Sequence, residues 1–303
     1  MPTNARYYMS RVIKVGQLDN EKIIAVAAIE NPVYVEIRGN RYTFTNFQRF
    51  GTESDTKGVF ARLAKYKPEG AVEVVRPETH AVGLEEIENL IEASSPFVYL
   101  PDFSRIAYKH VWNTLPRERF ERAFCELVDA SQRGFFVRCE LEPITDLRTF
   151  VARLARLDRV IELQATVKPP NPLFSPCWKS LNDYIKKRQL EEVNIKEEGP
   201  SGIVTNITQI ALAMDSANVP PDSLHQMMEP LLEGVGDAAL LMAADGYGRG
   251  KVVGLEQGRT IIIRTSENQK SFLHAKEPTP EDLFHVAHEE FAKLTDDRQL
   301  DHT

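Results

Sequence analysis

The chain has 303 residues, of which 42% are hydrophobic and 27% charged, with three cysteines and a formal net charge of -7. This composition excludes a disordered or fibrous protein, and the odd cysteine count argues against a disulfide scaffold. No apolar run reaches the roughly 18 residues of a membrane helix, and the N-terminus lacks the apolar core of a signal peptide. We therefore expect a cytoplasmic protein without membrane insertion.

The acidity lies almost wholly in the second half of the chain. Residues 1–170 hold 24 basic and 23 acidic side chains, whereas residues 171–303 hold 13 and 21. The change coincides with the proline cluster at 168–172, and exposed, proline-rich segments commonly separate domains. We predict an N-terminal domain at 1–168, a candidate for nucleic-acid binding, and an acidic C-terminal domain at 177–303, a candidate for dimerisation.

Apolar strands and amphipathic helices alternate through the first half. A hairpin is predicted at 33–47, because Gly39-Asn40 tolerates the positive φ of a tight turn. The spacing of leucines and isoleucines predicts a helix over 84–93, and Pro116 is typical of a helix start. Strands are predicted at 6–15, 71–75, 97–100, 105–111, 135–141 and 160–167, and a further helix is capped by Thr145 or Asp146.

The second half continues this alternation. Predicted there are helices at 177–189, 223–232 and 280–294, a buried strand at 238–243, and a hairpin that joins 251–255 to 260–265. Thr279 is expected to cap the last helix. The whole pattern predicts an α+β fold of two domains, with antiparallel sheets and helices packed on one face, and a ferredoxin-like element is an option at 97–167.

Motifs for catalysis and metal binding are incomplete. The glycines at 246–250 lack the spacing of a P-loop or a dinucleotide fingerprint, so a sharp strand-to-strand connection is the favoured interpretation. His285 and His288 stand three residues apart rather than four, and we interpret them as the solvated side of the last helix. Asp55-Thr56-Lys57 is a weak match to a restriction-type nuclease, because it lies in a loop. We expect no catalytic residues, no metal site and no cofactor.

The segment 34–67 has the composition most suited to binding nucleic acid. It holds seven basic side chains against three acidic ones, interleaved with seven aromatic rings. Basic groups neutralise phosphates and aromatic faces stack on bases, although the same pattern suits a hairpin with a buried aromatic face. The candidate nucleic-acid-binding residues are Arg38, Arg41, Arg49, Lys57, Arg62, Lys65 and Lys67.

Strand alternation adds a geometric expectation. Arg41 and Arg49 share one face of the second hairpin strand, opposite Tyr42 and Phe44. If the strand persists, the two arginines stand roughly 27 Å apart at about 3.4 Å per residue, so they would contact separate phosphates.

Several stretches stand out by their order along the chain. They are VEIRGNRYTFTNF, then FVYLPDFSRIAYKHVWN and FFVRCELEP, each followed by a helix, and finally DGYGRGKVVG. In this order they resemble the RexA-type phage-exclusion proteins and related small defence proteins. The resemblance implies a cytoplasmic homodimer of bacterial or phage origin that binds duplex DNA with little sequence preference and acts in phage exclusion.

We therefore predict a non-enzymatic, sequence-tolerant DNA-binding protein of phage exclusion or anti-phage defence. The apolar run at 238–243 and the hairpin that follows it are the expected homodimer contact. Two alternatives stay open: a nuclease or other hydrolase with an unrecognised site, and a protein-interaction subunit that contacts a partner protein of a defence system.

Overall fold

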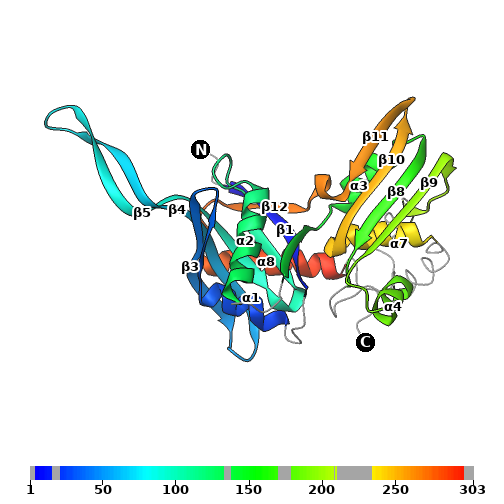
Figure 1. Cartoon of the computed structure of the whole chain (residues 1–303), viewed down its shortest axis with the longest axis horizontal. Coiled ribbons are helices and arrows are strands. Elements are labelled where there is room, and N and C mark those ends of the chain that lie inside the picture. The colour runs from blue at the N-terminus through cyan, green and yellow to red at the C-terminus, as the bar shows by residue number, and fades with distance from the viewer. Residues whose placement is uncertain are drawn as a thin grey trace.

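A computed structural model describes residues 4–15, 21–132, 138–169, 179–207, 209 and 234–296, and all structural statements below concern these residues. They form two antiparallel β-sheets, one of eight strands and one of four, that lie side by side in Figure 1. The predicted α+β class is therefore confirmed. No helix in this part of the chain is both long and apolar enough to span a membrane.

Eight strands form the larger sheet. They are β1 (Asn4–Val15), β2 (Tyr34–Ile37), β3 (Asn40–Gly51), β4 (Thr56–Arg76), β5 (Ala81–Leu100), β6 (Arg105–Lys109), β7 (Arg138–Pro143) and β12 (Ser271–Ala275). Their order is β12-β1-β6-β5-β4-β3-β2, and β7 pairs with the second half of β1. The ends of β4 and β5 extend beyond their neighbours as a two-stranded ribbon that projects from the body (Figure 1).

Part of this sheet is the ferredoxin-like element that the sequence offered as an option. β1, α1 (Glu21–Glu30), β5, β6, α2 (Arg117–Ser131) and β7 occur in this order, and β2 to β4 are inserted between α1 and β5. The four strands of the element lie in the order β7-β1-β6-β5, and every pair is antiparallel. The element runs from β1 to β7, so it begins well before the expected segment 97–167, and the expected last strand at 160–167 belongs to the smaller sheet instead.

Helices cover both faces of the larger sheet. α1 and α2 pack on one face, where the rings of Phe44, Phe97 and Phe124 meet edge to face. α8 (Pro280–Asp296) packs on the opposite face and buries Leu283 and Phe291 there. The expected packing of helices on one face describes the ferredoxin-like element, and α8 adds a third layer.

The smaller sheet has four strands in the order β11-β10-β8-β9. They are β8 (Arg159–Val167), β9 (Val193–Ile203), β10 (Gly248–Glu256) and β11 (Arg259–Arg264). The described helices that accompany this sheet are α3 (Leu147–Leu154), α4 (Lys179–Lys187) and α7 (Val235–Met242). The short helical turns among the described residues are η1 (Pro101–Phe103), η4 (Ala243–Tyr247) and η5 (Thr265–Asn268).

This sheet draws on both sides of the predicted domain boundary. β8 precedes the prolines but lies between β9 and β10, and Leu163 of β8 shares an apolar cluster with Leu240 of α7. Conversely, β12 and α8 follow the boundary in sequence but pack with the larger sheet. A division between 168 and 177 therefore cuts through one hydrophobic core. We correct the limits to a larger unit of 4–143 with 271–296, and a smaller unit of 147–264.

The helix predicted over 84–93 is wrong. These residues lie in β5, which pairs with β4 along the whole projecting ribbon. Their spacing is helical, but Leu84 and Ile91 are 70% and 57% exposed, so no core face supports a helix. The valines of 72–75 favour a strand, and this strand pairs with 84–91 across the turn at 77–80. The spacing of apolar residues within one segment carries no information about such a partner.

The strand predicted at 238–243 is also wrong, because the segment is helical in α7 and η4. Alanine, leucine and methionine have high helix propensities, and the run contains no β-branched residue. The predicted burial is confirmed, since all residues from 236 to 247 are buried. These side chains lie in the core of the smaller unit, so they cannot supply the homodimer contact expected of them.

Other predicted elements match the structure. The two predicted hairpins are β2–β3 and β10–β11, and the helices predicted from Pro116 and Pro280 are α2 and α8. Asp146 caps α3 by accepting a 3.0 Å hydrogen bond from the Thr149 amide, and Thr279 caps α8 in the same manner. The helix predicted at 223–232 and residues 170–172 of the proline cluster lie outside the described residues.

Candidate functional site

Six of the seven predicted DNA-binding side chains form ion pairs within the chain. At the end of β3, Arg49 contacts Glu30 of α1 at 2.6 Å. Lys57, at the start of β4, contacts Asp55 of the preceding loop at 2.9 Å. Each pair places a carboxylate where a phosphate would have to bind, so these two cations are already neutralised.

The cations of β4 are paired in the same way. Arg62 contacts Glu277, which precedes α8. Lys65 and Lys67 both contact Glu92 of β5, at 2.5 and 2.8 Å. The hydrogen bonds from Lys65 and Lys67 lower the pKa of Glu92, so this carboxylate stays ionised at neutral pH and holds both lysines.

The sixth ion pair is that of Arg41, which does not share a face of β3 with Arg49 as we expected. Arg41 lies 3.9 Å from Glu36, its cross-strand partner on β2. Beyond it, β3 carries a bulge at which Asn46 adopts a φ of 55°, and a bulge of one extra residue reverses the alternation of side chains. Phe47 therefore joins the cluster beneath α1 and α2, and Arg49 turns toward α1.

Arg38 is the one predicted residue without an ion pair among the described residues. It occupies the turn between β2 and β3 with a φ of 52°, and it is exposed. Of the seven predicted cations, the ion pairs of the described residues thus leave one, at an exposed turn, available to a phosphate. The structure thus places the predicted residues on one region of the larger sheet but does not assemble them into a free basic surface.

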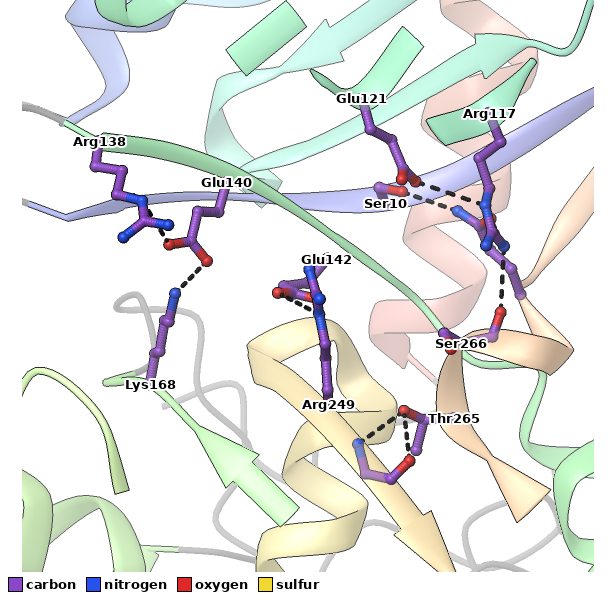
Figure 2. A network of polar contacts seen from close by, with 12 residues as sticks. Ser10, Arg117, Glu121, Arg138, Glu140, Glu142, Lys168, Arg249, Thr265 and Ser266 are labelled. Atoms are coloured by element: carbon purple, nitrogen blue, oxygen red, sulfur yellow. Dashed lines mark hydrogen bonds and ion pairs between the residues drawn. The ribbon is translucent and has the colours of Figure 1, made fainter. Parts of the chain in front are cut away.

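A polar network fills the junction between the two sheets (Figure 2). Glu140 of β7 contacts Lys168, and it lies 3.3 Å from Arg138. Glu142 accepts two hydrogen bonds of 3.1 Å from Nε of Arg249 in β10. Residues two apart on a strand share a face, so β7 directs both glutamates toward the smaller unit.

Buried charges reinforce this junction. Glu142 is only 3% exposed, and burial raises its pKa although the bond from Arg249 opposes the shift. Arg11 of β1 lies 3.3 Å from Asp245 of η4, and its guanidinium stands 3.9 Å from the centre of the Tyr247 ring. A buried ion pair adds little net stability but strongly penalises arrangements that break it, so these contacts fix how the two units sit together.

A second part of the network lies under the start of α2. The Tyr108 hydroxyl donates a 2.7 Å hydrogen bond to Glu121, and Gln269 donates one of 2.8 Å to Ser10. Burial raises the pKa of Glu121 to about 7. This carboxyl therefore titrates near neutral pH, in contrast to the permanently ionised Glu92.

Beyond the start of α2, the larger sheet leaves a patch of its face uncovered. Trp112 and Leu273 are 79% and 65% exposed there. Arg6 of β1 stands opposite Leu273 of β12, and its carbonyl accepts a 3.0 Å hydrogen bond from the His110 amide. We define the aromatic surface as Arg6, Tyr8, His110, Trp112 and Leu273.

A tight turn presents Trp112 at the edge of this surface. Residues 111 and 115 form an isolated bridge, and Asn113 between them has a φ of 63°. The Trp112 ring meets the His110 ring at 4.5 Å, and the His110 ring meets Tyr8 at 5.6 Å, both edge to face. The inner rings support the outer one, so Trp112 is held in place while it stays accessible.

His110 has both ring nitrogens buried and without a hydrogen-bond partner among the described residues. Burial lowers its pKa, so the ring is neutral at neutral pH. Beside it, Arg6 is exposed and donates a 3.0 Å hydrogen bond to the Ser271 hydroxyl, a neutral partner. The aromatic surface thus joins accessible rings to a cation that no carboxylate neutralises in the described part of the chain.

The sequence reasoning missed this surface, although a signal was present. Arg6 and Tyr8 are two residues apart in a predicted strand, and residues two apart share a strand face. His110 lies in the predicted strand 105–111, whereas Trp112 follows that strand and is placed by the tight turn. The proximity of the two segments depends on the pairing of β1 with β6, across about a hundred residues of chain.

The other motifs have structural explanations. Asp55 and Lys57 pair with each other, but only Asp55 lies in the loop, because β4 begins at Thr56. His285 and His288 lie on the exposed side of α8, as interpreted from the sequence. Gly246 has a φ of 85° in the connection from α7 to β10, so the predicted strand-to-strand connection is corrected to a helix-to-strand connection. Within the described ranges, no group of three His, Cys, Asp or Glu could hold a metal ion.

Comparisons with known proteins do not assign the chain to a family. No family model matches the chain, and no curated protein matches it significantly. The resemblance to RexA-type proteins therefore stays a prediction.

Proposed function

We propose that this protein binds DNA in a sequence-tolerant manner at the aromatic surface, with a preference for unpaired bases. The observation that carries this proposal is the exposed Trp112 ring, which is backed by His110 and Tyr8 and flanked by Arg6. The proposal keeps the predicted class of function but moves the site away from the β2–β3 hairpin.

The chemistry of the aromatic surface suits single strands. Every base has a π-face, so stacking on Trp112 tolerates all sequences, and such stacking is worth about 1–3 kcal/mol per base. Arg6 supplies a charge for a phosphate next to the stacked base. In a duplex the base faces are covered by their neighbours, so the ring would have nothing to stack on.

The test is a comparison of two forms of one sequence. Fluorescence anisotropy with a labelled single strand and with its duplex, at several salt concentrations, should show tighter binding of the single strand. Trp112→Ala should weaken single-strand binding by about 5- to 100-fold, which corresponds to the loss of one stacked base.

Tyr184→Ala is the matched control. Tyr184 is also an exposed aromatic residue, 50% accessible on α4, but it lies in the smaller unit. Its variant should bind as the parent does. Equal affinity of Trp112→Ala and the parent, with both folded by circular dichroism, would exclude the aromatic surface as the site.

The cellular role proposed on the resemblance is phage exclusion by a cytoplasmic homodimer. If DNA binding underlies that role, Trp112→Ala should also lose the reduction in phage plaques that the parent gives, and Tyr184→Ala should retain it. Light scattering over a wide concentration range tests the homodimer separately.

A further inference from the structure

The tip of the β4–β5 ribbon is strongly acidic, although the N-terminal half of the chain is nearly balanced in charge. Residues 68–91, which we name the arm, hold one arginine and six glutamates, a local formal charge of -5. β3 pairs with β4 only as far as Tyr66, and β6 pairs only with the last residues of β5. Both outer edges of the arm are therefore unpaired among the described strands. At about 3.3 Å per residue the arm reaches roughly 30 Å from the body (Figure 1).

One face of the arm combines acids with apolar side chains. Residues that stand opposite each other in an antiparallel pair share a face. The opposite pairs on this face are Glu69 with Glu88, Ala71 with Glu86, Glu73 with Leu84, and Val75 with Val82. The two valines and the leucine are 63%, 64% and 70% exposed. The face is thus a strip of exposed apolar groups bordered by four carboxylates.

This arrangement is poorly suited to stand alone in water. An isolated two-stranded ribbon is marginally stable, and like charges placed opposite each other, as in Glu69 and Glu88, weaken it. Of the twelve large hydrophobic side chains exposed in the described residues, five lie in the arm. Clustered exposed apolar groups of this kind mark interaction sites, and free strand edges accept a further strand.

The charge of the arm selects the kind of partner. Nucleic acid and anionic lipid surfaces would be repelled by a charge of -5, and a second copy of this chain carries a net charge of -7. We propose that the arm docks a cationic protein segment, which adds to a free strand edge and places its basic side chains against the glutamates. This inference does not depend on the aromatic surface.

A designed peptide tests the proposal on the full-length protein. The probe is a labelled eight-residue peptide of alternating lysine and valine, followed by fluorescence anisotropy. The Glu73→Gln/Glu86→Gln/Glu88→Gln variant should bind it at least tenfold more weakly than the parent. Val82→Ser/Leu84→Ser keeps the charges and should also lose affinity, because the apolar strip contributes to docking. A glutamate–valine peptide of the same length should not bind.

The control variant removes three exposed acids of the smaller unit, Asp183→Asn/Glu191→Gln/Glu192→Gln, and should bind the peptide as the parent does. Equal binding by the arm variants and the control would overturn the proposal, because attraction would then be general to the acidic chain. A dimer in light scattering that Val82→Ser/Leu84→Ser converts to a monomer would also overturn it, since the occupant would be a second copy.

Discussion

The β2–β3 hairpin region and the aromatic surface lie on the same sheet but differ in what the fold leaves available to a ligand. Around the hairpin, the cations Arg49, Arg62 and Lys65 are held by carboxylates from α1, the segment before α8, and β5. On the aromatic surface, Trp112 is exposed and Arg6 is bonded only to a neutral hydroxyl in the described part of the chain.

The difference shows that the type of a residue does not determine whether its side chain is available to a ligand. A run of seven cations and seven rings has the composition of a nucleic-acid site, yet tertiary contacts convert it into ion pairs and core. The aromatic surface draws on β1, β12 and the segment that follows β6. Its residues have no such composition in sequence, yet they place an exposed, supported ring beside a cation.

The largest effect should come from the buried carboxyl of Glu121 at the start of α2, which lies next to the aromatic surface in the polar network. The pKa of Glu121 is raised to about 7 by burial, so the unfolded chain loses this proton first as pH rises. The folded state should then lose stability between about pH 4.5 and 7, by at most about 3 kcal/mol, and no further above that range. Glu121→Gln should remove this loss in urea unfolding at pH 5, 6, 7 and 8.

Glu126→Gln, a half-buried position on the same helix that pairs with Arg122, serves as the comparison for that series. It should retain the pH dependence of the parent. Identical pH profiles for the two variants would mean that Glu121 is ionised in the fold and does not contribute the predicted loss.

A smaller effect on stability should separate the paired cations from the unpaired one. Arg62→Ala removes the contacts with Glu277 and with the Ser94 hydroxyl, and should lower the free energy of unfolding by about 1–2 kcal/mol. Arg38→Ala, at an exposed turn, should stay within about 0.5 kcal/mol of the parent. A loss for Arg38→Ala equal to that for Arg62→Ala would remove the distinction drawn between them.

The smallest effect concerns the salt dependence of DNA binding. Each lost phosphate contact lowers the log–log salt slope by about 1. Arg6→Ala should lower it by that amount. The Arg41→Ala/Arg49→Ala double variant should change it by less, because both arginines are paired with glutamates. If the salt slope of the double variant falls by about 2, the DNA interface lies at the β2–β3 hairpin, as the sequence predicted.

The sequence was sufficient wherever local patterns control the structure. The β2–β3 hairpin was predicted in the right place, although its turn residues are Arg38 and Gly39, one position before the predicted Gly39-Asn40. The apolar stripe of α2 and the Thr279 cap of α8 are confirmed. Each of these features depends on residues that are only a few positions apart in the sequence. The α+β class followed from their alternation.

The tertiary structure alone decided the domain limits, the arm and the site. β8 and β12 each join strands far from them in sequence, and the arm is a strand pair where spacing predicted a helix. The bulge at Asn46 reversed the direction of Arg49, and pairing of β1 with β6 brought Tyr8 to His110. In each case the residues that decide the outcome are distant in the chain. Whether a side chain is buried or ion-paired depends on these distant residues, so its own sequence neighbours do not reveal it.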